Sequence, residues 1–272
     1  MTNIDIRHGD CLEVLRDLPD NSVDSVVTSP PYAMQRKSTY GGIPEKDYPE
    51  WTVAWMREVW RVLKDDGSVI INIRPHIKNG QISDYVLRTR LALREAGWCE
   101  MEELIWNKKG GAPLGSTRRP RRSWESLLWF GKHCSAYSAP KAAGEYRENV
   151  KGGRGRQGPH IRRSLAEGSG GSWSGVARVS DVVEMSTRLN ANDSDLNRHP
   201  APFPWQLAEW CGKLITPPGG TILDPFTGSS STGVAAIRNG WNFIGIDQSA
   251  EYVEMSNRRL SEELAKAAEK QN

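Results

Sequence analysis

Hydrophobic and polar positions alternate along both ends of the chain in a pattern that predicts strands and helices in turn. Short apolar runs, rich in β-branched residues, predict strands at residues 4–6, 23–28, 68–73, 102–107, 123–130, 221–223 and 242–247. Apolar residues at helical spacing predict helices at residues 11–18, 49–63, 83–96, 205–214 and 250–267. The polar segment KDDG at residues 64–67 predicts a turn that ends the second of these helices.

Strands that are apolar on both faces imply that helices cover both sides of the sheet. Together with the alternation of strands and helices, this indicates an α/β fold with a doubly wound, mostly parallel sheet. Residues 108 to about 180 differ, because they are rich in Gly, Ser and Arg and show little periodicity. We therefore expect three segments: half of the sheet domain at residues 1–107, an irregular insertion at 108–195, and the other half at 196–272.

The positive charge of the chain is concentrated in the same irregular stretch. Residues 107–163 hold 14 Lys or Arg against 3 Glu, whereas the other residues hold 22 basic and 30 acidic side chains. The formal net charge of the whole chain is only +3. Segregation of this kind is an electrostatic footprint for a polyanion, and nucleic acid is the usual candidate. The alternative is a solvated basic loop that has no partner.

The apolar runs and the cysteine spacing argue against a membrane protein, a secreted protein and a zinc protein. The chain of 272 residues has no run of 18 apolar residues, so we expect no membrane span, and its first residues lack the apolar stretch of a secretory signal. Its four cysteines lie far apart without a Cys-x-x-Cys pair, which argues against a zinc site and against a disulfide framework. We therefore expect a cytoplasmic protein with unpaired cysteines and no metal.

The last third of the chain carries a motif for a nucleoside ligand. The stretch ILDPFTGSSSTGVAA places a strand, the acid Asp224, a turn of small residues and a helix in succession. In doubly wound sheets, ligands bind beyond the carboxyl ends of the strands. About twenty residues later Asp247 ends the next strand, where a carboxylate can accept hydrogen bonds from ribose hydroxyls. Because the turn is neither a Walker A loop nor GxGxxG, the pattern favours a nucleoside with a cationic tail over a dinucleotide.

Five sequence blocks occur in a characteristic order: GD at residues 9–10, TSPPY at 28–32, HPAPFP at 199–204, DPFTGSSSTG at 224–233 and GID at 245–247. With these blocks the chain resembles the DNA amino-methyltransferases that use S-adenosylmethionine, and in particular their beta group. The resemblance implies a class I methyltransferase fold, which is Rossmann-like. Its catalytic half would precede the basic middle, which would be a target-recognition insertion, and its cofactor-binding half would follow. Ser230 departs from the family pattern, which usually has a second glycine at this position.

The resemblance also implies a binding site for S-adenosylmethionine. Asp247 would hold the ribose, Asp10 would face the adenine amino group, and Phe203 would close the methionine side. Asp224, Phe226 and Gly228 would line the pocket for the methionine and adenosine parts of the cofactor. The complete set of residues expected to bind this cofactor is Asp10, Thr28, His199, Phe203, Asp224, Pro225, Phe226, Gly228, Ser229 and Asp247.

The expected catalytic element is the tetrapeptide Ser29, Pro30, Pro31 and Tyr32. An exocyclic amino group is a poor nucleophile, because its lone pair is delocalised into the ring of the base. The Ser29 hydroxyl and the Pro30 carbonyl could accept hydrogen bonds from this group, and the stiffness of proline keeps the carbonyl aimed. Tyr32 offers a flat face, and stacking of a base on an aromatic ring contributes about 1–3 kcal/mol. The target base must be flipped out, because its amino nitrogen is unreachable inside a duplex.

The sequence narrows the identity of the methylated atom. Methylation of ring carbon C5 needs a thiolate, usually from a Pro-Cys pair, and the chain has no Pro-Cys dipeptide. In the family that the chain resembles, serine before Pro-Pro usually accompanies N4-cytosine enzymes, so we favour N4 of cytosine. N6 of adenine is the alternative. A methyltransferase for RNA or protein amines and a non-catalytic DNA-binding subunit are further alternatives.

The basic insertion is expected to bind double-stranded DNA. The candidate contacts to phosphates or guanine are Arg118, Arg119, Arg121, Arg122, Lys151, Arg154 and Arg156. We expect residues 33–48 to form a lid that becomes ordered on DNA. Four tryptophans are expected in the core: Trp51, Trp55, Trp60 and Trp241. A cognate restriction endonuclease would be a partner if the chain belongs to a restriction–modification pair. We expect a monomer or a homodimer.

Overall fold

The structure, a computed structural model, describes residues 2–34, 41–109, 118–140, 142–144, 146–151, 172–176, 179–186 and 204–269. Eight strands form one large sheet: β1 (Ile4–His8), β2 (Val23–Thr28), β3 (Leu63–Ile73), β6 (Cys99–Lys109), β7 (Trp124–Gly131), β10 (Val182–Ser186), β11 (Thr221–Asp224) and β12 (Asn242–Asp247). The helices are α1 (Cys11–Arg16), α3 (Tyr48–Val62), α4 (Tyr85–Glu95), α5 (Trp205–Ile215), α6 (Ser231–Asn239) and α7 (Ala250–Glu269).

The strands of the large sheet are arranged in the order β1-β12-β11-β2-β3-β7-β6-β10. All neighbouring pairs are parallel except those of β7, which runs antiparallel to both β3 and β6. This confirms the predicted doubly wound, mostly parallel sheet. Strands β7 and β10 both lie within residues 108–195, so part of that segment belongs to the sheet. The domain boundaries stay a prediction.

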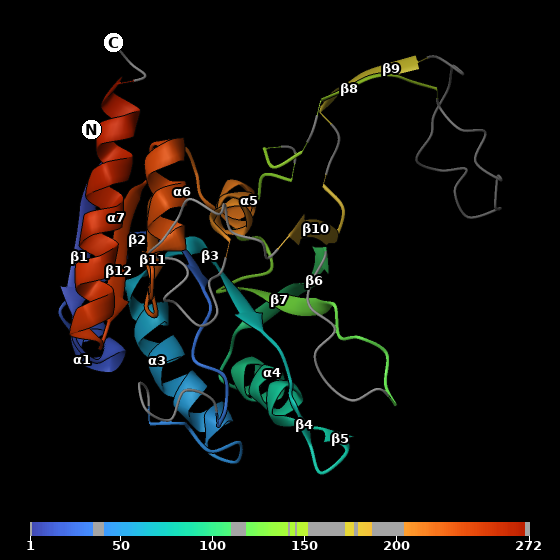
Figure 1. Cartoon of the computed structure of the whole chain (residues 1–272), viewed down its shortest axis with the longest axis vertical. Coiled ribbons are helices and arrows are strands. Elements are labelled where there is room, and N and C mark those ends of the chain that lie inside the picture. The colour runs from blue at the N-terminus through green and yellow to red at the C-terminus, as the bar shows by residue number, and fades with distance from the viewer. Residues whose placement is uncertain are drawn as a thin grey trace.

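Helices cover both faces of this sheet, and the strand residues alternate accordingly (Figure 1). Val26, Ile71 and Leu128 belong to a core that includes α1, α3 and α4. Their chain neighbours Val27, Ile70 and Leu127 belong to a second core, with α5, α6 and Leu260 of α7. Since successive strand residues point to opposite faces, continuous apolar runs fill both cores at once. This is why the apolar strands could be found in the sequence.

The predicted turn at residues 64–67 is wrong, because β3 begins at Leu63 and runs through this polar segment. The register between β2 and β3 shifts here, so that Leu63 pairs with Val23 and Ser68 with Ser25. The Lys64 ammonium donates to Asp24 Oδ1 over 2.7 Å. Gly67 permits the irregularity, because a Cβ atom at this position would lie 2.6 Å from the Leu63 side chain. Hydrogen bonding to β2 thus overrides the turn propensity of the sequence.

The expectation that all four cysteines are unpaired is also wrong. Cys99 and Cys134 form a disulfide with a Cα–Cα distance of 5.6 Å, whereas Cys11 and Cys211 are free and buried. The antiparallel register of β6 and β7 places Cys99 opposite Gly131, three positions before Cys134. A separation of 35 residues in sequence does not reveal this proximity.

Two small antiparallel hairpins accompany the large sheet: β4 (Ile77–Lys78) with β5 (Gln81–Ile82), and β8 (Tyr146–Lys151) with β9 (Ser172–Val176). Figure 1 shows β8 and β9 extending away from the sheet. Within the described ranges, no helix has the length and apolar character needed to cross a membrane. Likewise, the described residues contain no group of three or more His, Cys, Asp or Glu that could hold a metal ion.

Candidate active site

Four neighbouring parallel strands, β1, β12, β11 and β2, present their carboxyl ends at the same edge of the sheet. Asp10, Ser29, Asp224 and Asp247 lie at or just beyond these ends. A pocket opens at this edge and is lined by Gly9, Asp10, Cys11, Pro31, Ile43, Trp51, Pro225, Phe226, Asp247 and Gln248. It therefore joins the predicted catalytic segment to the predicted cofactor segment.

The Asp224 carboxylate links β2 to the turn that follows β11. Thr28 Oγ1 donates to its Oδ1 over 2.7 Å, and Thr232 Oγ1 donates to its Oδ2 over 2.8 Å. The backbone N–H of Phe226 also donates to Oδ1, over 3.1 Å. Burial raises the pKa of Asp224 to about 6, although these three donors oppose the shift. The carboxylate thus fixes the position of Thr28, the residue directly before Ser29.

Asp247 organises the same edge one strand further along. Its Oδ2 accepts the backbone N–H of Gly228 and its Oδ1 accepts that of Ser249, each over 2.9 Å. The backbone N–H of Gly9 donates to the Asp247 carbonyl over 3.0 Å, which ties the end of β1 to the end of β12. Asp247 is 2% exposed and still lines the pocket.

Two further predicted residues, Asp10 and Phe226, line the same pocket. Asp10 is the N-cap of α1, and its Oδ1 accepts the backbone N–H of Leu12 over 2.9 Å. Phe226 packs against two tryptophans of α3, with its ring centroid 5.5 Å from that of Trp51 and 5.3 Å from that of Trp55. The expectation that Trp51 belongs to the core was incomplete, because Trp51 is half-buried and also lines the pocket.

The turn between β11 and α6 places Ser230 in the left-handed region, with φ 59° and ψ 43°. Gly228 also has a positive φ, of 51°. Ser230 is fully buried, and its Oγ lies 3.2 Å from Thr227 Oγ1. The position therefore has the conformation that favours glycine, which explains why a serine is a departure from the family pattern. Ser229 is buried as well, and its carbonyl accepts from Arg259 over 2.6 Å.

Asn72 of β3 holds the predicted catalytic segment on the side expected to face the target base, which we call the target side, and the sequence reasoning missed this residue. Asn72 is 2% exposed, and its Nδ2 donates to the Ser126 carbonyl over 3.2 Å. Its Oδ1 therefore faces the catalytic segment and accepts from the Tyr32 hydroxyl over 3.0 Å and from Ser29 Oγ over 3.4 Å. An amide inside the apolar run SVIINI was the signal that could have revealed this residue.

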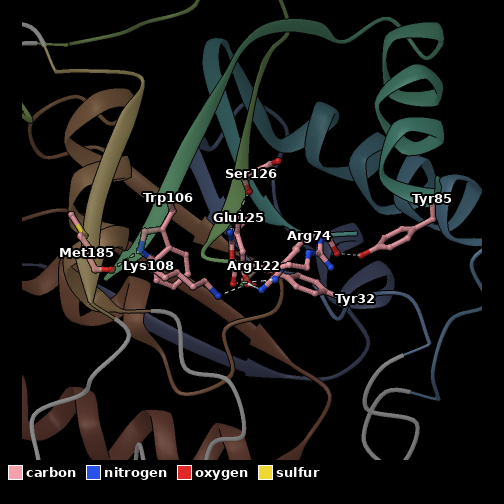
Figure 2. A network of polar contacts seen from close by, with 11 residues as sticks. Tyr32, Arg74, Tyr85, Trp106, Lys108, Arg122, Glu125, Ser126 and Met185 are labelled. Atoms are coloured by element: carbon pink, nitrogen blue, oxygen red, sulfur yellow. Dashed lines mark hydrogen bonds and ion pairs between the residues drawn. The ribbon is translucent and has the colours of Figure 1, made fainter. Parts of the chain in front are cut away.

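Glu125 of β7 is the second residue that was missed. It is 6% exposed, and its Oε2 lies 3.0 Å from the Tyr32 hydroxyl oxygen, so Asn72 and Glu125 share the single proton of this hydroxyl. Lys108 contacts its Oε1, and an Arg74 nitrogen lies 3.9 Å from the same oxygen (Figure 2). Burial and the Glu125 charge raise the pKa of Tyr32 well above its usual value, so Tyr32 stays a neutral donor. A charged residue within the apolar run SWESLLWF was the available signal.

The structure describes only some of the predicted binding residues. His199, Phe203, Arg154 and Arg156 lie outside the described residues, as do residues 35–40 of the predicted lid and the side chain of Lys151. Four of the predicted DNA contacts are described and exposed: Arg118, Arg119, Arg121 and Arg122. They lie between the end of β6 and the start of β7, and Arg119 donates to the Gly80 carbonyl.

Comparisons with known proteins show the family of this chain. Residues 23–258 match the model of the N6/N4 methyltransferase family, which is described as DNA methylase. The type II methyltransferase M.XycI of Xanthomonas campestris pv. cyanopsidis is 31% identical over 289 residues, which cover 93% of this chain and 86% of M.XycI.

Two solved structures share the fold. PvuII DNA methyltransferase, titled cytosine-N4-specific, has a TM-score of 0.74 at 24% identity and covers 98% of this chain and 93% of its own. TTHA0409 of Thermus thermophilus, solved in complex with S-adenosyl-L-methionine, has a TM-score of 0.61 at 23% identity, with 97% and 96% covered. With its fold, its strand-end pocket and the match to the family model over residues 23–258, the chain belongs to the N6/N4 family of DNA methylases.

Proposed function

We propose that this DNA methylase transfers a methyl group from S-adenosylmethionine to N4 of a flipped-out cytosine within a specific DNA sequence. The observation that carries the proposal is the 2.7 Å hydrogen bond between Thr28 and Asp224. It joins two residues that are 196 positions apart in sequence and so holds the Ser29–Tyr32 segment beside the turn at the pocket. A methyl acceptor on one side and a methyl donor on the other would therefore meet at this segment.

The pocket suits S-adenosylmethionine in its chemistry. Its lining contains two carboxylates, Asp10 and Asp247, and the aromatic rings of Trp51 and Phe226, but no basic side chain among the described residues. Acidic groups favour ribose hydroxyls and a cationic ligand, and aromatic rings favour a nucleobase. When bound, this cofactor supplies an electrophilic methyl group on a sulfonium. We assign Asp247 to the ribose and Asp10 to the adenine amino group.

The Ser29–Pro30 pair would localise the lone pair of the amino group. The Ser29 hydroxyl donates its proton towards Asn72 Oδ1, so the lone pairs of its oxygen are available to accept from the base. The Pro30 carbonyl would accept the second amino hydrogen, and the proline ring keeps that carbonyl fixed. Two acceptors in fixed positions align the amino nitrogen with the methyl group, which is mainly a task of positioning.

Tyr32 would stack on the flipped base. Its hydroxyl donates to Asn72 and lies within hydrogen-bonding distance of Glu125, so the orientation of the ring is held from two strands. A ring held in place loses little freedom when the base stacks on it. The high pKa of Tyr32 excludes the phenolate as a general base near neutral pH.

Two observations support cytosine over adenine. The residue before the proline pair is Ser29, and the structural neighbour with a TM-score of 0.74 is titled cytosine-N4-specific. The type II name of M.XycI supports a restriction–modification role with a cognate endonuclease. We further propose double-stranded DNA as the substrate and the cytoplasm as the location. A monomeric or homodimeric state stays a prediction.

The direct test is methyl transfer from labelled S-adenosylmethionine to unmodified DNA. We expect 4-methylcytosine after digestion to nucleosides, and sequencing of DNA from a host that expresses the chain would give the target sequence. Ser29→Ala serves as the inactive control. Labelled 6-methyladenine would contradict the assignment of the base but not that of the reaction. Labelling of RNA or protein instead of DNA would contradict the proposed function itself.

A further inference from the structure

Three basic side chains converge on the target side of Tyr32 from three separate elements. Arg74 directly follows β3, Lys108 lies near the end of β6, and Arg122 precedes β7. All three surround the buried carboxylate of Glu125, as Figure 2 shows. An Arg74 guanidinium nitrogen also donates to the Arg122 carbonyl over 3.3 Å, which holds the two arginine segments together.

The positive charge of this cluster exceeds its negative charge. Lys108 forms an ion pair with Glu125 and thereby matches its single charge. Arg74 reaches the same oxygen only at 3.9 Å, and within the described ranges no carboxylate lies within 4.0 Å of Arg122. The cluster of Arg74, Lys108 and Arg122 against Glu125 therefore has an excess of two positive charges.

The partial burial of Arg74 makes this excess costly in the free protein, whereas Arg122 is exposed and open to a ligand. Only 22% of the Arg74 side chain and 19% of the Lys108 side chain are exposed. The Nε of Arg74 is buried without a hydrogen-bond partner, and a buried unsatisfied donor destabilises the protein. Burial and the neighbouring Arg74 lower the pKa of Arg122, which shows the same repulsion between like charges. An anion between the two guanidinium groups would relieve both penalties.

We propose that Arg74 and Arg122 form a binding site for the DNA phosphate next to the flipped-out base. The inference rests on the proposed function and extends it to the DNA backbone. A flipped nucleotide carries its phosphodiester with it, and Glu125 connects Tyr32 directly to the arginine cluster. Planar guanidinium groups match two phosphate oxygens with two parallel hydrogen bonds. The phosphate would neutralise the cluster at the moment when the base stacks on Tyr32.

The experiment combines protein variants with DNA that lacks one charge. Duplexes of the target sequence found by sequencing would carry a single neutral methylphosphonate in place of each phosphate around the target base in turn. The kcat/KM of the wild type, Arg74→Ala and Arg122→Ala would be measured on each duplex. The matched control is Arg88→Ala on α4, because this exposed arginine pairs with Asp84 away from the cluster.

On ordinary DNA we expect each variant to lose about 10–100-fold in kcat/KM, as for a lost hydrogen bond to a charged group. At one position, the methylphosphonate should lower the kcat/KM of the wild type clearly but that of each variant less than about twofold. The variants already lack the arginine that would bind this phosphate. The slope of log affinity against log salt concentration should also fall by about 1. Arg88→Ala should behave as the wild type on every duplex.

Two results would overturn the inference. In the first, every methylphosphonate lowers the kcat/KM of each variant by the same factor as that of the wild type. This would show that neither arginine binds a phosphate. A changed preference for the base beside the target would show that the arginines read base edges instead. Thermal melting of each variant shows whether it is folded. Arg74→Lys keeps the positive charge and should therefore recover part of the lost kcat/KM. A wild type that methylates no DNA would overturn the proposed function as well, whereas the other two results leave it intact.

Discussion

On the cofactor side of Ser29–Tyr32, carboxylates accept hydrogen bonds from neutral hydroxyl and backbone N–H groups. Thr28, Thr232 and the Phe226 N–H hold Asp224 in this way. On the target side, a single carboxylate is instead surrounded by basic side chains from three elements. The two sides thus differ in charge as well as in the kind of group that holds them in place.

This difference matches the two ligands of the proposed reaction. A side with carboxylates and without basic side chains in its described lining favours a cation, whereas a side with surplus arginines favours a polyanion. The tetrapeptide Ser29–Tyr32 lies between the acidic pocket and the basic cluster. This separation of charge would keep each ligand from binding at the other's site, because the wrong ligand would be repelled by charge of its own sign.

The largest effect is expected at the boundary itself. Ser29→Ala removes one acceptor for the amino group, and loss of one preorganised hydrogen-bonding group typically lowers kcat by about 10²–10³-fold. Affinities for S-adenosylmethionine and for DNA should change little, as measured by titration calorimetry and by fluorescence anisotropy. Ser22→Ala is the control, because the Ser22 hydroxyl donates to the nearby Pro19 carbonyl at an exposed site. A Ser29→Ala variant with full activity would contradict the assigned role.

The next largest effect is a pH dependence of stability that comes from Asp224 on the cofactor side. Burial raises the pKa of Asp224 from 3.8 to about 6, so the folded state binds more protons than the unfolded state between these values. Stability should therefore fall as the pH rises from about 4 to about 6, by about 3 kcal/mol from this group. Urea unfolding at several pH values should show a flatter profile for Asp224→Asn than for the wild type. Asp66→Asn, at an exposed site of β3, should leave the profile unchanged.

A smaller effect on stability is expected when the carboxylate on the target side loses its charge. Glu125→Gln removes the charge that matches Lys108 and should lower the free energy of unfolding by about 2 kcal/mol. The affinity for S-adenosylmethionine should stay the same, because the cofactor pocket does not include Glu125. Adding Lys108→Met should recover part of the lost stability, since the double variant leaves no unmatched charge from this pair. Equal losses in the single and double variants would argue against the coupling.

The smallest effect concerns the cofactor turn. Ser230→Gly should raise the free energy of unfolding by about 1 kcal/mol, because a non-glycine residue in the left-handed region is strained. Gly233→Ala, one turn into α6, should lower it, because the new Cβ would lie 2.8 Å from Phe243 and 2.9 Å from Leu260. Chemical denaturation of both variants gives the comparison. A destabilised Ser230→Gly variant would show that the Thr227 contact outweighs the strain.

The cofactor side could be predicted from the sequence largely because it is made of short local motifs. Asp224, Phe226 and Asp247 each end or follow a strand, and parallel strand ends meet at one edge. The target side could not, because Asn72 and Glu125 come from strands whose pairing is set by the register of β7 between β3 and β6. A polar residue in an apolar run indicates a special site but not its partners.

The same limit explains the two structural errors. The polar segment 64–67 reads as a turn locally, and only its pairing with β2 makes it a strand. The disulfide depends on the register of two antiparallel strands, which no cysteine spacing encodes. Local propensity succeeded where neighbours in sequence decide the structure, and it failed where long-range pairing does.

The pairing of β1 with β12 has a consequence for how the protein is made. Ile4 pairs with Phe243, so β1 cannot join the sheet until residue 243 has left the ribosome. The Thr28–Asp224 bond imposes the same order on the reaction centre. Contacts between residues this far apart in sequence make folding slow, so the proposed reaction centre would form late in folding.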